Sequence, residues 1–570
     1  MLSERINNIR KLISLFYKGY KWRLVIAVLL NIISSLLGGF NLLLLIPLLN
    51  IISNNPRNPE GFSKYIYQIV NSTGLEVNLI SVLILFLLFY IASNLLQRFS
   101  TVLTNRYQME FQSSLQKDFF DLMTKSRWDI IRKEHSSNYI KIITNDINRT
   151  GGAVNQLLML YTSLINVTIN LTVAFFMSFY LTATGIVIML ILLWILQKNN
   201  ILIYNESKSN QLHTKEVFTK ITEYISGLKI AKINGGEKYI KEKFNDSVDQ
   251  IKNTRISVQI KQSHTKILFS IFAALFLSVF IFIGIEYFNT GSAVLLLLIA
   301  IFSRLTASFS SISQNYQRLL SMIPSFADYE HYYERLKNNI DKHEFNEVDI
   351  RLKDKISFKN VAFSYGNGDI FSDLSFDINK GKINTLVGES GTGKTTVADL
   401  ICGLLEPNKG NIYIDNLKLS SDNYKSWLKK ISYVTQENYL FDLTLKENIL
   451  LSNPKASKEN IWEALKKASV YDFVASHPDK LNMKVGERGS NISGGERQRL
   501  QIAAALVKSP ELLILDEATS ALDETNEEKI LQSLNNMTPE ITIFMISHKR
   551  KVLEYSDNYL VLQNKMIIND

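Results

Sequence analysis

The residues best suited to chemistry begin at a glycine-rich turn in the C-terminal third of the chain. Residues Ile383–Val387 are predicted to form a buried strand, and the turn follows that strand directly. Glycines lack a Cβ, so successive backbone N–H groups can face phosphate oxygens, and Lys394 adds positive charge beside the β- and γ-phosphates. The Thr395 hydroxyl can coordinate Mg²⁺, and the helix that starts here points its N-terminal dipole at the same anion. The residues expected to hold the nucleotide phosphates are Gly388, Glu389, Ser390, Gly391, Thr392, Gly393, Lys394, Thr395 and Thr396.

Two carboxylates end a second predicted strand further along the chain. Residues Leu512–Leu515 form an apolar run, and Asp516 and Glu517 follow it. Asp516 is suited to the coordination shell of Mg²⁺, and Glu517 is suited to polarising the attacking water, since a base must lie within hydrogen-bond reach of that water. The alternative is a strand that simply ends on an exposed acidic pair, and the phosphate-binding turn upstream disfavours it.

A second glycine-rich turn lies just upstream of that strand, within Ile492–Arg499. Its residues Ser493, Gly494 and Gly495 precede a predicted helix, so the turn can serve as a second phosphate cradle. One nucleotide can use two cradles from distant parts of a chain only where the two cradles converge.

This second turn resembles the signature sequence of ATP-binding cassette (ABC) proteins, in which the turn of one subunit closes over ATP held by the other. The resemblance implies a head-to-tail pair of ATPase domains with two ATP sites at their interface. The chain departs from the family pattern where Ile492 replaces the usual Leu and Glu496 replaces the usual Gln. Because the cradle needs Ser493 and the two glycines, this departure bears on the kinetics of the site rather than on its existence.

Further positions match the family residue by residue. Tyr365 resembles the aromatic residue that stacks on adenine, the alternative being an ordinary core tyrosine. Gln436 resembles the loop glutamine that contacts Mg²⁺ and the membrane domain, and His548 resembles the histidine that contacts the γ-phosphate. Asp523 closes the run Ser520–Asp523, which resembles the segment that links the two sites across the dimer. Residues Gly486–Gly489 resemble a stretch typical of exporters that meets cytoplasmic loop tips, which favours export over import.

The N-terminal half carries six apolar runs, most of them close to the roughly 20 residues that cross a membrane. The third and fourth runs are joined near Tyr180 and form a hairpin, and the fifth and sixth turn at Phe288–Gly291. The six predicted spans are Leu24–Leu49, Val77–Gln97, Val154–Phe179, Thr182–Leu196, Ile267–Tyr287 and Ser292–Ser313.

Lys and Arg residues orient these spans. They precede the first span, follow the second and fill the segment between the fourth and the fifth, whereas neither hairpin turn carries one. Basic residues mark the cytoplasmic side of membrane proteins. We therefore expect a multi-pass protein of the cell membrane with both termini, both long loops and the ATP-binding domain in the cytoplasm.

The two long loops keep helical patterning with few Gly or Pro. The spanning helices are therefore predicted to continue into the cytoplasm and to reverse near Trp128–Tyr139 and Ile225–Lys232, where the tips could touch a cytoplasmic domain. Solvated hairpins without a special role are the alternative. Between the first two spans, apolar residues at helical spacing in Phe62–Ile69 suggest a short helix on the outer membrane surface or a packed loop helix.

These features predict an α-helical six-span transmembrane domain joined to an α/β P-loop ATP-binding cassette. The predicted divisions are residues 1–320 for the transmembrane domain, 321–350 for a linker and 351–570 for the cassette. The net charge of +10 is concentrated around the spans and does not indicate nucleic acid. The single cysteine, Cys402, lies in an apolar run and is expected to be a small core residue.

The family likeness covers nearly the whole chain and is that of a type IV (B-family) ABC exporter half-transporter. It implies ATP and Mg²⁺ as cofactors, contact with membrane lipids, and a homodimer with two competent sites, because one chain carries every catalytic position; a heterodimer stays open. The catalytic positions are Lys394, Gln436, Ser493, Asp516, Glu517 and His548.

The cargo is the least defined part of the prediction. We expect ATP-driven export or flipping of a hydrophobic or amphiphilic substrate (a lipid, lipid-linked glycan, peptide or drug) by alternating access. A weaker resemblance is to bacterial lipid-linked oligosaccharide flippases. An ATP-gated channel or regulator on the same scaffold is the alternative, and the spans argue against a soluble cassette ATPase. Polar residues in the spans could line a pathway or join helices, and they are Asn41, Asn94, Asn166, Asn170, Ser303 and Arg304.

Overall fold

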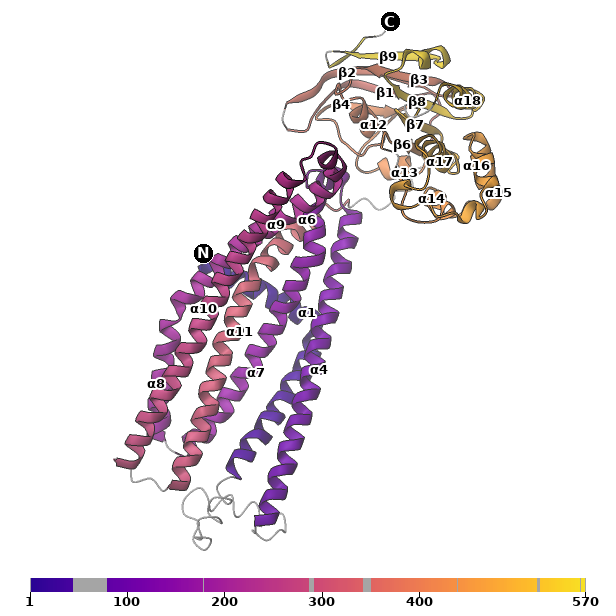
Figure 1. Ribbon diagram of the computed structural model, residues 1–570. Helices are drawn as coiled ribbons and strands as arrows, with labels where there is room; N and C mark the ends of the chain where they lie inside the picture. The colour runs from indigo at the N-terminus through magenta and orange to yellow at the C-terminus, as the bar shows by residue number, and fades with distance from the viewer. Residues whose placement is uncertain are drawn as a thin grey trace. The chain divides into compact units, whose positions relative to one another are not determined.

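The computed structural model shows two compact units, and each is described by itself (Figure 1). The first unit comprises Met1–Ser126 and Lys133–Asn339, and the second comprises Arg127–Arg132 and Ile340–Asp570. The structure describes residues 2–44, 79–177, 179–286, 292–341, 350–366, 368–437, 439–519, 523–563 and 565–568.

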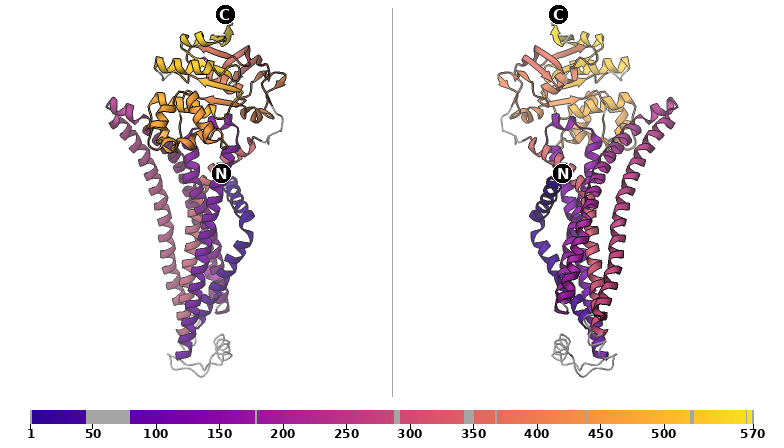
Figure 2. Two further views of the ribbon diagram at one scale, coloured as in Figure 1. Left: turned by 90° about the vertical axis from the view of Figure 1, so that its right-hand side faces the viewer. Right: turned by 90° about the vertical axis from the view of Figure 1, so that its left-hand side faces the viewer.

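The described part of the first unit is built of helices. The longest, α10, has 50 residues, which corresponds to about 75 Å at 1.5 Å per residue. A hydrocarbon core is only about 30 Å thick, so this helix extends well beyond any membrane that it crosses, as the patterning of the long loops predicts. The helices among the described residues of the unit are α1 (Leu2–Leu43), α4 (Leu79–Lys125), α6 (Ser136–Lys141), the π-helix η1 (Ile142–Asp146), α7 (Ile147–Met177), α8 (Phe179–Ile195), α9 (Gln197–Ile233), α10 (Glu237–Glu286) and α11 (Ser292–Asn338). The long helices run alongside one another over most of their length (Figure 2).

Five helical stretches in the described residues are long and apolar enough to cross a membrane: Ser3–Asn41, Leu79–Lys125, Ser136–Phe175, Thr182–Ile233 and Glu237–Val279. They contain the first five predicted spans in large part. The sixth predicted span coincides with the start of α11, where the side chains of residues 292–298 are not described. The turn at 288–291 and the expected outer helix at 62–69 lie outside the described residues.

These stretches expose more apolar side-chain surface than is stable in contact with water. In α4, Leu83, Leu87, Ile91 and Leu95 are each between 45% and 58% exposed, and only 6% of the most apolar window of this stretch is buried within the protein. An exposed apolar surface of this size is stable in lipid rather than in water. The first unit is therefore a membrane-spanning unit.

Polar side chains join the helices inside that unit. Asn31 of α1 donates to Thr162 of α7 at 3.1 Å, and Ser100 of α4 donates back to the Asn31 side-chain oxygen at 3.0 Å. Ser35 of α1 donates to Asn166 of α7. Hydrogen bonds of this kind hold helices together where the surrounding solvent is apolar.

Arg304, one of the polar residues noted in the spans, also makes a contact between helices. Its Nη1 donates to the backbone carbonyl oxygen of Gly38 on α1, at 3.2 Å. Asn94 and Asn170 instead donate to carbonyl oxygens one turn earlier in their own helices. Of these residues, Asn166 and Arg304 join two helices through their side chains.

An ion cluster built around the buried Lys141 and Asp146 joins α6, η1, α9 and α11, outside the six predicted spans. Lys141 Nζ lies 3.0 Å from Asp146 Oδ2 and 2.8 Å from Asp328 Oδ2. Gln211 Nε2 donates to Asp146 Oδ1 at 2.6 Å and to Asp328 Oδ2 at 3.1 Å. The side chains of Lys141 and Asp146 are 3% and 0% exposed, so each charge depends on the other for compensation.

Helix α11 continues through the first half of the segment expected to be a linker and ends at Asn338. Its residues Ile323, Phe326 and Tyr329 are at most 1% exposed. Burial of these side chains against the first unit explains why the helix does not stop at residue 320, even though Pro324 lies inside it.

Two sheets form the frame of the second unit (Figure 1). The six-stranded sheet has the order β10-β9-β3-β8-β7-β6, and its inner strands are parallel. The four-stranded antiparallel sheet has the order β2-β1-β4-β5. The bounds are β1 (Lys355–Ser364), β2 (Asp369–Asn379), β3 (Ile383–Gly388), β4 (Lys409–Ile414), β5 (Leu417–Lys418), β6 (Ile431–Val434), β7 (Leu512–Asp516), β8 (Thr542–Ser547), β9 (Asn558–Gln563) and β10 (Met566–Ile568). The α/β class predicted from the sequence is confirmed.

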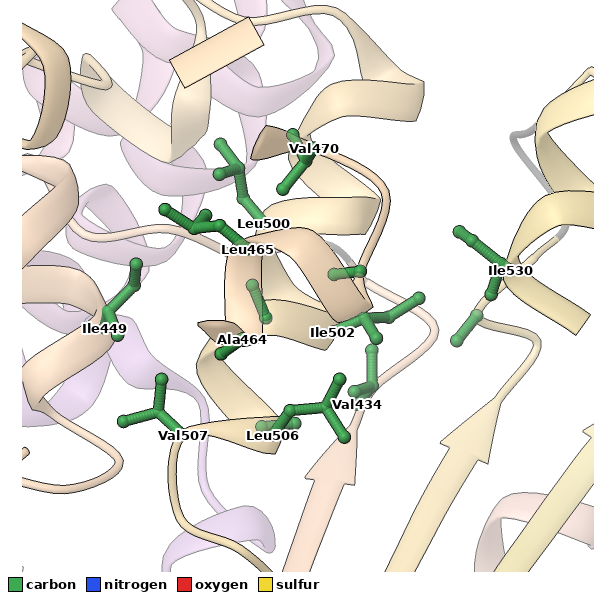
Figure 3. Packing of buried hydrophobic residues seen from close by; sticks show 14 of the residues in the cluster. Val434, Ile449, Ala464, Leu465, Val470, Leu500, Ile502, Leu506, Val507 and Ile530 are labelled. Atoms are coloured by element: carbon green, nitrogen blue, oxygen red, sulfur yellow. The ribbon is translucent and has the colours of Figure 1, made fainter. Parts of the chain in front are cut away.

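Helices cover the six-stranded sheet and add a helical layer of their own. Figure 3 shows Leu465, Leu500, Ile502 and Leu506 packed together in the core of this layer. Cys402 is 1% exposed at the end of α12, as expected of a core residue, and burial raises the pKa of its thiol. The helices of the unit are α5 (Trp128–Arg132), α12 (Lys394–Ile401), α13 (Tyr424–Leu428), α14 (Leu445–Leu450), α15 (Lys458–Lys467), α16 (Tyr471–Ser476), α17 (Gly494–Leu506) and α18 (Glu524–Asn535), with short 3₁₀ turns at Lys480–Asn482, Glu487–Gly489 and Arg550–Tyr555.

The ion cluster predicts a large difference between two lysine substitutions. Lys141→Ala leaves the buried Asp146 carboxylate without its cation and is expected to cost about 3 kcal/mol or more of stability. Lys125→Ala removes an exposed pair with Asp121, whose two side chains are 60% and 57% exposed, and should cost about 0.5 kcal/mol or less. Thermal unfolding of the full chain in detergent compares the two, and equal losses would contradict the importance of the cluster.

Candidate nucleotide site

The parallel pairing of three strands brings the predicted chemistry to one edge of the sheet. Val387 of β3 pairs with Ser547 of β8, and Asp516 of β7 pairs with Ile546 of β8. The strands therefore end side by side, and the residues that follow them meet at their carboxyl ends. This edge is where open α/β sheets bind their ligands.

The glycine-rich turn follows β3 and wraps around the start of α12. Gly391 and Gly393 have φ values of +81° and +102°, a backbone conformation that side chains disfavour. A Cβ at Gly393 would also lie 2.7 Å from Ile370 Cγ2 and from Phe371 Cζ. Lys394 is 6% exposed, and its Nζ donates to the carbonyl oxygens of Gly388 and Glu389, each at 2.9 Å.

A cavity of about 700 Å³ opens over this turn. Its volume is in the range of small-molecule sites. Its lining residues are Asp369, Ile370, Glu389, Ser390, Gly391, Thr392, Gly393, Lys394, Thr395, Thr396, Gln436, Glu517, Leu562, Gln563 and Lys565. The structure thus brings together nearly all of the residues predicted to hold the phosphates, with Gln436 and Glu517 facing the same space.

Asp516 and Thr395 lie together as a candidate Mg²⁺ pair. The Thr395 hydroxyl donates to Asp516 Oδ2 at 2.8 Å, and the Tyr433 hydroxyl donates to the same oxygen at 3.1 Å. Asp516 is 2% exposed; burial raises the pKa of its carboxyl group, and the two hydroxyl donors oppose that rise. A carboxylate and a hydroxyl are oxygen donors of the kind that Mg²⁺ prefers beside substrate phosphates, so these residues fit the ion.

Glu517 lies between two of the residues expected to act with it. Gln436 Nε2 donates to Glu517 Oε2 at 2.8 Å, and His548 Nδ1 lies 3.7 Å from Glu517 Oε1. The Glu517 backbone has a φ of +50°, and its N–H donates to the carbonyl oxygen of Ile546 at 3.0 Å. Three of the side chains predicted to be catalytic, those of Gln436, Glu517 and His548, therefore converge.

Tyr365 is 38% exposed and is not part of the core. Its ring lies under the guanidinium of Arg132, 4.7 Å from the ring centroid, and Arg132 Nη1 donates to the Tyr365 hydroxyl at 2.6 Å. Thr396 Oγ1 is 3.3 Å from the same hydroxyl. The aromatic side chain is thus placed next to the helix that carries the phosphate-binding turn.

The second glycine-rich turn begins α17. Ser493 is the N-cap residue, and its hydroxyl donates to Glu496 Oε2 at 2.6 Å. The Ser493 backbone N–H also donates to Glu496 Oε2 at 3.1 Å, and the Glu496 backbone N–H donates to Ser493 Oγ at 3.4 Å, so the two residues form a capping box. Ser493, Gly494 and Gly495 are not among the described residues that line the cavity of their own chain.

Asp523 caps α18 and is linked back to α17. Its two carboxylate oxygens accept from Thr525 and Asn526, each at 2.6 Å, and these hydrogen bonds lower its pKa to about 2. Arg499 Nη1 donates to Asn526 at 2.7 Å. Ser520, Ala521 and Leu522 lie outside the described residues.

Three contacts near the site were not expected from the sequence. Tyr433 bonds Asp516, Arg132 covers Tyr365, and Gln498 Nε2 lies 3.4 Å from the carbonyl oxygen of Glu517. Tyr433 follows the alternation of a strand and could have been noticed from that pattern. No local pattern signals the other two, because each joins distant parts of the chain.

An ATP-binding α/β domain joined to a membrane-spanning unit defines an ATP-driven membrane transporter. The chain belongs to the ABC transporter family: the model of the ABC transporter transmembrane region matches residues 24–313, just over half of the chain, and the ABC transporter model matches residues 371–520. It is accordingly an ATPase coupled to transport. One transmembrane region followed by one ATP-binding domain is the organisation of a half-transporter.

Similar proteins include exporters of several cargoes. The heterocyst differentiation ATP-binding protein HepA of Nostoc sp. is 28% identical over 82% of this chain and 77% of its own length. The ATP-dependent lipid A-core flippase of Coxiella burnetii is 26% identical over 89% of this chain and 87% of its own. The β-(1→2)glucan export protein NdvA of Bartonella quintana is 38% identical over 38% of this chain and 37% of its own.

A solved structure shares the fold along almost the whole chain. It is a bacterial Atm1-family ABC exporter with ATP bound, with a TM-score of 0.80 and 20% sequence identity, covering 97% of this chain and 95% of that one. The expected architecture, a helical transmembrane domain with an α/β nucleotide-binding domain, is confirmed.

Asp399 predicts a pH dependence of stability beside the site. It is 7% exposed on α12, and burial raises the pKa of its carboxyl group to about 6, with Arg132 opposing and Asp516 adding to the rise. A raised pKa means that the folded state holds the proton more tightly than the unfolded state, so stability falls as pH rises through about 6. Asp399→Asn should therefore stabilise the full chain by about 1–2 kcal/mol at pH 7.5, with a gain that narrows below pH 6. Thermal unfolding in detergent measures this, and a gain that grows as pH falls would contradict the assignment.

Proposed function

We propose that two copies of this chain form an exporter that binds ATP at two shared sites and moves an amphiphilic cargo across the cell membrane. Each site would combine the phosphate-binding turn of one chain with the Ser493–Gly495 turn of the other. The observation that supports this most strongly is that Ser493–Gly495, a glycine-rich turn at the N-terminus of α17, does not line the cavity of its own chain.

Gly494 supports a shared site independently. A Cβ built at Gly494 meets nothing within 4 Å, and its φ is not positive. Neither the space around this residue nor its backbone conformation requires glycine within the chain. A group that approaches from outside, such as ATP held by a second chain, would supply the reason.

Within each site, the described side chains can divide the chemistry among them. Lys394 and the backbone N–H groups of the turn would hold the phosphates, and Tyr365 would stack on the adenine. Glu517 would accept a proton from the attacking water, and Gln436 and His548 would orient the Glu517 carboxylate. Mg²⁺ held by Thr395 and Asp516 would neutralise phosphate charge.

Transport requires the membrane-spanning unit to respond when the ATP sites close. The end of α9 carries Ile225, Ile230 and Ile233, which are 70%, 67% and 73% exposed. The ATP-binding unit carries a groove lined in part by the exposed side chains of Tyr439, Phe441 and Leu451. We propose that closure of the ATP sites is coupled to alternating access of the spans, with the termini and the ATP-binding unit in the cytoplasm.

The cargo is proposed to combine apolar and polar parts. Apolar side chains cover the outer surface of the spans, whereas amide and hydroxyl groups join α1, α4 and α7 within them. Among the similar proteins, one is named as a flippase of lipid A-core and one as an exporter of β-(1→2)glucan. Stimulation of ATP hydrolysis by candidate cargoes in lipid nanodiscs would identify the class, and uphill movement in vesicles would separate a pump from an ATP-gated channel.

The proposed base makes a direct prediction. Glu517→Gln keeps the size and hydrogen-bonding reach of the side chain but cannot accept the proton. ATP hydrolysis should fall by about 100-fold or more, while ATP affinity measured by equilibrium binding stays within about twofold. Vigorous hydrolysis by the purified variant would contradict the assignment.

The shared site predicts complementation between two inactive variants. Lys394→Ala removes the ammonium group that would contact the phosphates at one turn, and Gly494→Ala places a methyl group in the other turn. The rate of ATP hydrolysis of each homodimer should fall by about 100-fold. A mixed dimer, purified through two different tags, contains one site with both residues intact. Its rate of ATP hydrolysis in a single-turnover experiment should be well above that of either homodimer. If both residues served one site within the same chain, the mixed dimer would contain no intact site and would recover nothing.

A further inference from the structure

Gln498 is a fully buried polar side chain that the proposed chemistry does not use. It lies in the second turn of α17, and it is 0% exposed. Its Nε2 donates to the carbonyl oxygen of Glu517 at 3.4 Å, and its Oε1 has no hydrogen-bond partner in the part of the chain that the structure describes. Burying an amide with one end unsatisfied costs free energy, so the residue is not explained by the stability of the core.

The group that Gln498 contacts is the backbone of the proposed base. Glu517 has a φ of +50°, which a residue with a side chain adopts only where its surroundings hold it there. Ile546 holds the Glu517 N–H from one side, and Gln498 meets the Glu517 carbonyl from the other. Gln436 donates to the Glu517 carboxylate. The position of this carboxylate also depends on the Glu517 backbone, which Gln498 of α17 contacts.

Helix α17 also carries the turn that would contact the ATP of the other chain. Ser493 is its N-cap, and Gln498 follows five residues later, a separation of about 7.5 Å along a helix axis. A helix transmits displacement of its first turn to the next turn, because intrahelical hydrogen bonds tie the two together. A shift of Ser493 on contact with a phosphate would therefore reach Gln498.

From these contacts we infer that Gln498 is a positioning residue that sets the backbone of Glu517 and links it to the Ser493–Gly495 turn. Closure of this turn on ATP held by the partner would then align the base that acts on ATP held by the chain's own phosphate turn. The inference rests on the proposed function for the roles of Glu517 and of the turn. Arg499, which reaches Asp523 through Asn526, forms a separate connection that bypasses Glu517.

The test compares three variants of the full chain in nanodiscs. Gln498→Met keeps the volume but removes the amide donor, and kcat for ATP hydrolysis should fall by about 10- to 100-fold, with KM for ATP and the melting temperature unchanged. Gln498→Glu can donate only when protonated, so its kcat relative to wild type should rise as pH is lowered from 8 to 6. Gln532→Met, on the exposed face of α18, is the matched control and should keep wild-type kcat and KM.

A double-mutant cycle tests the link to the turn. If Ser493 acts on Glu517 through Gln498, the loss of kcat in Ser493→Ala with Gln498→Met should be smaller than the product of the two single losses. Losses that multiply fully would overturn the link.

Two results would overturn the positioning role itself. One is wild-type kcat in Gln498→Met, and the other is a loss of kcat that is matched by a lower melting temperature and a higher KM, since that pattern indicates a structural role. Glu517→Gln separates the two levels of the proposal. If that variant is inactive while Gln498→Met is normal, only the inference about Gln498 fails; if Glu517→Gln keeps its turnover, the proposed base fails.

Discussion

The parallel pairing of β3, β8 and β7 is the constraint on which the nucleotide site depends. It places the ends of three strands in one row, although Gly388, Asp516 and Ser547 are far apart in the sequence. Parallel strands require long connections, and those connections supply α12 with the phosphate turn and α17 with the second turn. A change of one residue in this register would separate Thr395 from Asp516, which now meet at 2.8 Å.

A different balance of forces governs the membrane-spanning unit. Its apolar side chains point outward, so the hydrophobic effect in water cannot hold its helices together. Polar contacts do this within the spans, as between Asn31 and Thr162, and the ion cluster of Lys141, Asp146 and Asp328 does it outside the predicted spans. The buried charges of Lys141 and Asp146 favour one arrangement of their helices over others, since a displacement that separates them leaves a buried charge uncompensated.

Much of this structure could be predicted from local patterns in the sequence. The phosphate turn, the apolar strand before Asp516 and the long apolar runs each follow from spacing alone, and the structure brings Gln436 and Glu517 to the same cavity. The continuation of α11 to Asn338 was not predicted, although Ile323, Phe326 and Tyr329 recur at a spacing that fits a helix. The contacts of Arg132 with Tyr365 and of Gln498 with Glu517 could not be predicted, because a hydrogen bond between distant segments leaves no periodic signal. The roles of the individual site residues stay predictions.

The burial of Cys402 has a practical consequence. It is the only cysteine among the 570 residues, it is 1% exposed, and burial raises the pKa of its thiol, so little thiolate is present to react. The natural chain therefore behaves as a cysteine-free background toward thiol-directed probes. A pair of spin labels or fluorophores could be attached at two cysteines introduced on the surface without first replacing Cys402, and the distances between the labels would follow the opening and closing of the transporter.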